Sequence, residues 1–168
     1  MMLCNTWYAN LLCYQLPDAY AQVRGDELHS NLWGMVNFYI VPGGTLITAE
    51  FTELPKGKGM CDGKVLGFHI HEGTNCSGKP GNPFTDAGGH YNPHECPHPH
   101  HAGDLPPLFS CNGYAFMALT TNRFPVRDII GRTVIVHENP DDFTTQPSGN
   151  AGSMIACGKI IRTDKKRR

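Results

Sequence analysis

The stretch Gly67–Glu72 reads GFHIHE and ends an apolar run of the sequence. In a β-strand, residues i and i+2 point to the same face, so this spacing predicts that His69 and His71 leave one face of a strand as a pair. Phe68 and Ile70 would then enter the core. A lone histidine on a strand is more often a hydrogen-bonded structural residue, but a His-x-His pair is a ready pair of metal ligands.

Most other histidines of the chain gather near this pair. The chain has nine histidines, and eight of them lie between His69 and His137. Imidazolium groups repel one another at close range, whereas neutral imidazoles can share a metal, so this crowding indicates metal binding. His137 ends a second strand-like run, Thr133–Glu138. Because strand ends gather at one edge of a sheet, we expect His137 to lie at the same rim as the pair.

The composition excludes several classes of protein. A length of 168 residues predicts one domain, and a net charge of −1 gives no electrostatic case for a nucleic-acid partner. The sequence has no apolar run of about 18 residues, so we predict no membrane span. The N-terminus lacks a charged region followed by an apolar one. We therefore predict a cytoplasmic protein.

Short β-branched and aromatic runs, separated by turn residues, predict an all-β fold. Glycine and proline are abundant, at 19 and 13 residues, and 42–44 (PGG) and 112–113 (NG) are hairpin signals. Eight runs are predicted to be strands, at 20–25, 34–41, 45–51, 65–72, 105–109, 114–120, 132–138 and 155–162. Strands at this spacing predict a β-sandwich or a flattened barrel.

The chain divides into a domain with short flanking segments. Residues 1–19 show no clean period and are predicted to be an N-terminal extension, in which a short helix over 6–14 is an alternative. Residues 20–162 are predicted to form the domain, and residues 163–168 a basic, solvated tail.

Residues 73–103 show neither the strand nor the helix period. A structureless loop of about thirty residues in a compact domain needs something to order it, and metal coordination or a disulfide could do so. The chain has seven cysteines, so at least one has no partner within the monomer.

Five motifs follow one another along the chain. They are 67–72 (GFHIHE), 89–93 (GHYNP), 101–105 (HAGDL), 131–138 (GRTVIVHE) and 149–153 (GNAGS) followed by 156–158 (ACG). In this order and with these gaps, they resemble the copper/zinc superoxide dismutase family, and a bacterial branch of it. The resemblance covers roughly residues 20–162. It implies an eight-stranded Greek-key, immunoglobulin-like barrel with long metal-binding and active-site loops. It also implies an enzyme that disproportionates superoxide to O₂ and H₂O₂ with copper and zinc ions.

The resemblance implies two metal sites that share one residue. The copper ligands would be His69, His71, His90 and His137. The zinc ligands would be His90, His98, His101 and Asp104. His90 would bridge the metals as an imidazolate and act in catalysis as a proton donor.

The resemblance also implies two supporting features. Asp141 would be the carboxylate that joins a copper histidine to a zinc histidine and fixes their tautomers. Cys76 and Cys157 would form a disulfide that ties the metal loop to the last strand. A homodimer is compatible with the family, although its dimer surfaces differ between branches.

The sequence departs from the family at Met154, where the family has an arginine beside copper. A guanidinium offers charge and a planar pair of donors to an anion, and a thioether offers neither. We therefore expect superoxide to associate more slowly and the rate to be reduced. A compensating charge could come from Arg123, Arg127 or Lys79.

Alternatives remain for the function and for the ligands. Met154 favours a copper-binding or carrier protein on the same fold, but the complete ligand set argues against it; a structural protein clamped by zinc is a further alternative. Cys96 and His100 could compete for zinc, as could the neighbouring His94, although all three also fit exposed loop residues. His29 is predicted to be a surface residue.

Overall fold

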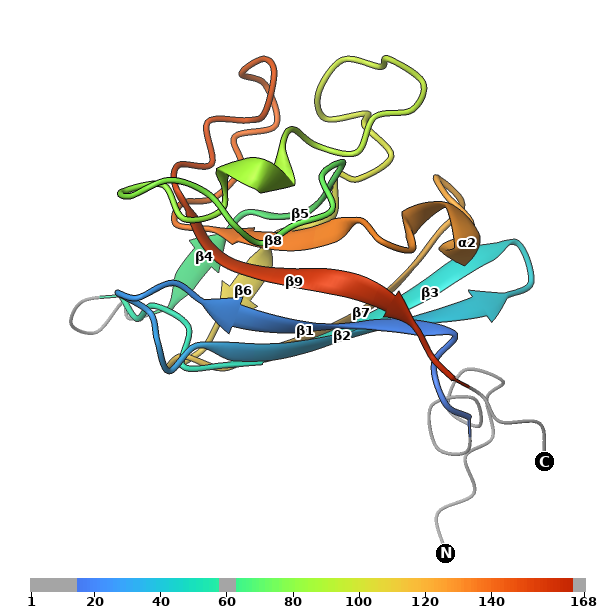
Figure 1. The fold of residues 1–168 in the computed structure, drawn as a ribbon, viewed down its shortest axis with the longest axis horizontal. Helices are drawn as coiled ribbons and strands as arrows, with labels where there is room; N and C mark the ends of the chain where they lie inside the picture. The colour runs from blue at the N-terminus through green and yellow to red at the C-terminus, as the bar shows by residue number, and fades with distance from the viewer. Residues whose placement is uncertain (1–14, 58–62, 165–168) are drawn as a thin grey trace, which may run out of the picture.

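The computed structural model describes residues 15–57 and 63–164, which form a curled antiparallel β-structure (Figure 1). This confirms the predicted all-β fold. Nine strands are found in the described residues: β1 (Ala19–Gly25), β2 (Trp33–Val41), β3 (Gly44–Thr52), β4 (Lys64–Leu66), β5 (Phe68–His71), β6 (Leu108–Ser110), β7 (Ala115–Thr121), β8 (Thr133–His137) and β9 (Met154–Arg162). The helical elements are the 3-10 turn η1 (Thr85–Ala87) and the short helix α2 (Val126–Ile129).

Seven strands form one sheet in the order β5-β8-β9-β1-β2-β3-β7, and β4 pairs with β6. The edges of the seven-stranded sheet are β5 and β7. In the chain, β4 directly precedes β5, and β6 directly precedes β7. The β4–β6 pair therefore draws the two edges together, and the sheet curls into a flattened barrel. Consecutive strands β7 and β8 are not neighbours, so their connection crosses one end of the barrel.

The strand predicted over 65–72 is divided at Gly67, which is why nine strands replace eight. A Cβ at Gly67 would lie 2.9 Å from that of Ala151 and 3.2 Å from that of His137, so only glycine fits there. Its backbone N–H donates to Asn139 at 2.8 Å, and its carbonyl accepts from His137 at 2.8 Å. The chain therefore changes partner at Gly67, from β6 to β8.

The two predicted hairpin turns are present. The β2–β3 turn contains Pro42 and Gly43, and Gly43 has a φ of 84°. Proline followed by a residue with positive φ is the pattern of a type II turn. Asn112 and Gly113 have φ values of 50° and 84°, as a type I′ turn requires.

Two boundaries differ from the prediction. Strand β6 begins at Leu108 rather than at residue 105, because Pro106 and Pro107 have no N–H to donate to a ladder. Helix α2 lies between the strands predicted at 114–120 and 132–138, where no helix is predicted, and follows Pro125. Its side chains Val126 and Ile129 are buried in the core, so α2 closes the barrel where the β7–β8 connection crosses.

Strands β5 and β8 are buried at every position, whereas β7 alternates. Phe68 and Ile70 belong to the main core, as predicted, so the barrel interior covers one face of β5. In Figure 1, two long loops, residues 73–103 and 138–153, stand over the other face of β5 and β8. The histidine face of the sheet is therefore buried beneath these loops.

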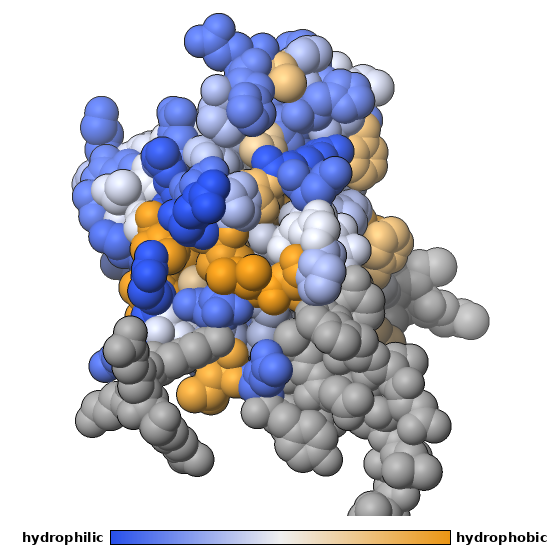
Figure 2. Space-filling model, turned by 90° about the vertical axis from the view of Figure 1, so that its right-hand side faces the viewer, coloured by the Kyte–Doolittle hydropathy of each residue, from blue (hydrophilic) through white to orange (hydrophobic). Residues whose placement is uncertain are grey.

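Figure 2 shows the molecule from the end near α2, where hydrophilic side chains lie above an apolar patch. At this end Ile40, Val126 and Ile130 line a cavity of about 390 Å³. In the part of the chain that the structure describes, no helix has the length and apolar character needed to cross a membrane.

Candidate metal centre

The loop 73–103 turns back along the free edge of β5. The N–H of Ile70 donates to Gly103 at 2.9 Å, and the N–H of Tyr91 donates to Ile70 at 2.8 Å. An isolated bridge places His90 opposite His71. A side chain at Gly103 would overlap the carbonyl of Ile70, so glycine allows this close approach. Strand pairing thus brings a loop histidine beside the His-x-His pair.

The same loop is fixed to the barrel by packing and by a disulfide. Phe84 and Ala87 form an apolar cluster with Ile135 of β8 and Cys157 of β9. Cys157 is bonded to Cys76, with Cα atoms 5.6 Å apart, which confirms the predicted disulfide. The loop that shows no period in the sequence is therefore held by pairing, by an apolar cluster and by a covalent bond.

Four histidines form a first group on the outer face of β5 and β8. They are His69, His71, His90 and His137. One nitrogen from each ring lies within 4.8 Å of the others. Their exposed fractions are 7% or less. This face is the one that the His-x-His spacing predicts.

Backbone carbonyls fix the tautomers of two of these rings. His71 Nδ1 lies 2.8 Å from the carbonyl of Gly88, and His137 Nδ1 lies 3.2 Å from that of Gly152. A carbonyl only accepts, so each Nδ1 carries the hydrogen and each Nε2 keeps its lone pair. The two Nε2 atoms lie 3.2 Å apart. Two lone pairs that face each other repel, and a cation between them would remove the repulsion.

Asp141 joins the first group to a second one. Its Oδ2 accepts from His69 Nε2 at 2.8 Å, and its Oδ1 accepts from His98 Nε2 at 2.9 Å. The N–H of Phe143 also donates to Oδ1 at 2.7 Å. These bonds leave the Nδ1 atoms of both histidines without a hydrogen-bond partner among the described residues, although they are buried.

A second group contains His90, His98, His101 and Asp104. The carboxylate of Asp104 lies 2.7 Å from His90 Nδ1, 3.1 Å from His98 Nδ1 and 3.2 Å from His101 Nδ1. The last two contacts are not hydrogen bonds, so the Nδ1 atoms of His98 and His101 have no hydrogen-bond partner within the described chain. Three imidazoles and a carboxylate at one point are a donor set that suits zinc.

His90 belongs to both groups. Its Nδ1 faces Asp104 in the second group, while its Nε2 is buried without a partner in the described residues. An unpaired buried nitrogen costs free energy unless something binds it. Four histidines in the first group, and three histidines with one aspartate in the second, share His90 and therefore fit two metal ions. The first ion would have only imidazole ligands, as copper accepts.

Burial sets the charge of the site. Burial first, and then the neighbouring histidines, lower the pKa of His71 well below its usual value and the pKa of His137 to about 3. Burial also lowers the pKa of His69, although its hydrogen bond to Asp141 acts in the opposite direction. Hydrogen bonds from histidines lower the pKa of Asp141 and Asp104 against their burial. The rings of His69, His71 and His137 are therefore neutral and the carboxylates of Asp104 and Asp141 ionised near neutral pH, which is the state that binds a metal.

We expect the metal-free protein to lose stability as the pH falls below about 6.5, the usual pKa of histidine. Below that pH the unfolded chain protonates His69, His71 and His137, while folded His137 stays neutral until about pH 3. Each such histidine would lower the free energy of unfolding by about 1.4 kcal/mol per pH unit. Urea unfolding between pH 7.5 and pH 4.5 measures this slope. A His137→Gln variant should have a shallower slope, and equal slopes would contradict the assignment.

Several other predicted residues lie elsewhere. His94, Cys96 and His100 belong to neither group in the described chain, and Cys96 is half-buried with its thiol 3.8 Å from the carbonyl of His94. His29 is partly exposed, with its Nδ1 2.7 Å from a carboxylate oxygen of Asp26, and belongs to neither group. Cys4, Cys13 and Cys61, and the short helix considered over 6–14, lie outside the described residues.

Met154, the residue expected at the arginine position, begins β9 opposite His137. The ladder has an irregularity between Val136 and His137, a feature that re-aims side chains. Met154 is partly buried and packs against the cluster of Phe84 and Cys157. It thus lies next to a histidine of the first group, with its side chain against apolar residues.

Gly149 opens the motif 149–153, but the sequence does not show what it does at the site. It has a φ of 69°, and a Cβ there would overlap the carboxylate of Asp141 and lie 2.7 Å from His98 Nε2. Glycine at this position therefore leaves room for the bond that joins the two groups.

Known proteins are similar to this chain in sequence and in fold. Residues 33–160 match the family model described as copper/zinc superoxide dismutase. A copper-zinc superoxide dismutase of Legionella pneumophila is 36% identical over 135 residues, which cover 76% of each chain. One of Deinococcus radiodurans is 33% identical over 156 residues, covering 81% of this chain and 82% of the relative. The crystal structure of a double mutant of a superoxide dismutase-like protein from Bacillus subtilis has a TM-score of 0.70 and 31% identity, covering 84% of this chain and 96% of that one.

Proposed function

Because this chain belongs to the copper/zinc superoxide dismutase family, we propose that its first group holds copper and its second group holds zinc. The protein is an oxidoreductase that converts superoxide into O₂ and H₂O₂. The observation that carries the assignment is His90, which presents Nε2 to the first group and Nδ1 to the second. The copper ligands are then His69, His71, His90 and His137. The zinc ligands are His90, His98, His101 and Asp104.

Copper held by the first group would supply the one-electron redox chemistry that the conversion of superoxide requires. Two superoxide ions and two protons thus become O₂ and H₂O₂. His90 can hold a proton at Nε2 while its Nδ1 stays with the second group, and it can give that proton to the peroxide product. Asp141 keeps the Nε2–H of His69 and His98 directed at its carboxylate, so both Nδ1 atoms stay free to bind. Burial keeps competing water from these nitrogens.

Metal content and turnover, measured together, test this proposal. We expect the purified protein to bind one copper and one zinc per chain and to consume superoxide. Copper without turnover would favour a copper carrier on the same fold. Zinc without copper would favour a structural zinc protein.

We expect Met154→Arg to raise the rate constant for superoxide by about threefold to tenfold. The guanidinium would place a positive charge and two donors beside His137, where the native thioether offers neither. Pulse radiolysis at low and high ionic strength measures both the rate and its salt dependence, which should become steeper. Met154→Leu is the neutral control and should leave both unchanged. Native protein that already reaches the rate of the arginine variant would contradict a role for Met154.

Three further expectations stay predictions: a cytoplasmic location, a homodimer and the absence of a nucleic-acid partner. So do the boundaries of the domain at 20–162. Light scattering of the purified chain would give its oligomeric state.

A further inference from the structure

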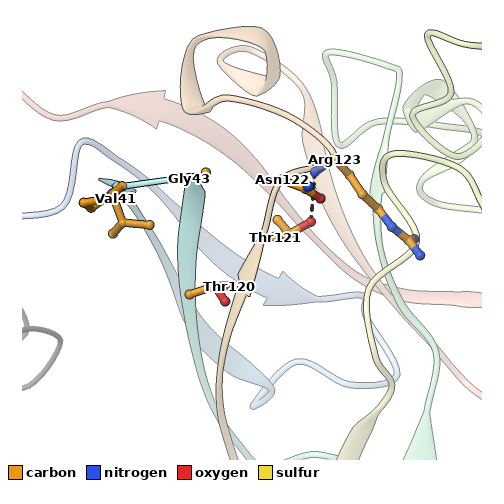
Figure 3. Close-up of a pocket in the computed structure, with 8 residues that line it drawn as sticks. Val41, Gly43, Thr120, Thr121, Asn122 and Arg123 are labelled. Atoms are coloured by element: carbon orange, nitrogen blue, oxygen red, sulfur yellow. Dashed lines mark hydrogen bonds between the residues drawn. The ribbon is translucent and has the colours of Figure 1, made fainter.

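Arg123 reaches the second group from outside its ligand set. Figure 3 shows this residue beside the cavity lined by Val41 and Gly43, with its side chain extending away from that cavity toward the neighbouring loop. There its Nη1 lies 3.0 Å from the carbonyl oxygen of Asp104 and 3.2 Å from that of His101. A third carbonyl, of Pro99, is 3.4 Å away. One guanidinium nitrogen thus gathers three carbonyls of the segment that carries two zinc ligands.

Gln146 holds the third ligand from a different loop. Its side-chain Oε1 accepts from the N–H of His98 at 3.0 Å, and its Nε2 donates to the carbonyl of His98 at 2.8 Å. The amide therefore satisfies both backbone groups of one residue, as a neighbouring strand would. This contact joins the loop 138–153 to the loop 73–103 at the histidine that also bonds Asp141.

We propose that Arg123 and Gln146 are positioning residues, which hold the backbone of His98, His101 and Asp104 in the arrangement that binds the second metal. The proposal rests on the assignment of this group to zinc. Neither side chain contacts a ligand atom of the group, and both residues are exposed. Their effect therefore passes through the backbone to the direction of the imidazole and carboxylate donors.

The charge of Arg123 makes the direction of the change in zinc affinity informative. A positive charge near a cation site opposes metal binding by Coulomb repulsion, so its removal should by itself strengthen zinc binding. Loss of positioning should do the opposite. The two effects predict opposite changes in one measured affinity.

The experiment uses the full chain, freed of metal and titrated with Zn²⁺ and separately with Cu²⁺ against competing chelators. The variants are Arg123→Gln and Gln146→Met, which remove the contacts without adding charge. The matched controls are Arg127→Gln, whose exposed guanidinium lies 3.4 Å from Asp128, and Gln22→Met on β1. Arg123→Lys keeps the charge and offers donors without the planar fork. Thermal unfolding of each metal-free variant measures stability.

We expect both variants to bind zinc about tenfold more weakly, in the range of residues that orient metal ligands. Copper affinity should fall less than about threefold, the controls should match the native protein, and Arg123→Lys should recover part of the loss. Unchanged or tighter zinc binding by Arg123→Gln would overturn the proposal. So would a joint loss of zinc affinity, copper affinity and metal-free stability, since that marks general damage to the fold. A native chain that binds no zinc would instead overturn the proposed function.

Discussion

Replacement of His90 by alanine is expected to abolish superoxide turnover and to weaken metal binding at both groups. His90 is the one residue that the two groups of described residues share. Its Nδ1 faces Asp104 of the second group, and its Nε2 is left for the first. Alanine removes one of four donors from each group. It also removes the group proposed to hold the proton at Nε2.

Titration with each metal, together with superoxide consumption, measures this effect. We expect activity below about one thousandth of the native value, since both a metal ligand and a proton donor are lost. His101→Ala is the matched control, because His101 belongs to the second group alone. It should weaken zinc binding and leave copper binding closer to native. Should His90→Ala retain native copper affinity, the shared role of His90 would be wrong.

The second large effect concerns the disulfide. Cys76 and Cys157 are separated by 81 residues, so their bond closes a long loop in the unfolded chain. Loss of such a bond is expected to lower the free energy of unfolding by about 4 kcal/mol. For a chain of this size, that corresponds to a fall in Tm of about 8–16 °C. Cys157 also packs in the apolar cluster beneath the loop, so the loop should loosen.

Thermal unfolding and limited proteolysis of a Cys76→Ala/Cys157→Ala double variant test both parts of this expectation. Proteolysis should cut within residues 73–103 before it cuts the strands. Cys111→Ala is the control, because Cys111 is a free, exposed cysteine. A double variant with native Tm and native resistance of the loop would show that packing and metal binding suffice to hold it.

The gathering of three of the histidines could be predicted from the sequence, because the signals for it are local. The His-x-His spacing alone places His69 and His71 on one face, since the strand period is two. His137 is predicted at the same rim because it ends an apolar run, and the structure places its N–H on the carbonyl of Gly67. The loop ligands follow only from the resemblance, because spacing cannot tell His98 and His101 from their neighbour His100.

Contacts made through the backbone could not be predicted. Nothing in the sequence around Arg123 or Gln146 distinguishes them from other exposed polar residues, because their partners lie in a distant loop. The division of the predicted strand at Gly67 was also not predicted, since the apolar run continues across it. That break depends on the side chains of Ala151 and His137, which only the folded chain brings near.

Asp141 has a consequence for how the protein acquires its metals. The same carboxylate accepts hydrogen bonds from His69 of one group and from His98 of the other. An ion that fixes one of these histidines therefore also fixes the carboxylate, which then holds the other histidine in place. The two ions should therefore be taken up with positive cooperativity. By thermodynamic linkage the coupling is reciprocal: whatever factor zinc adds to the affinity for copper, copper adds to the affinity for zinc.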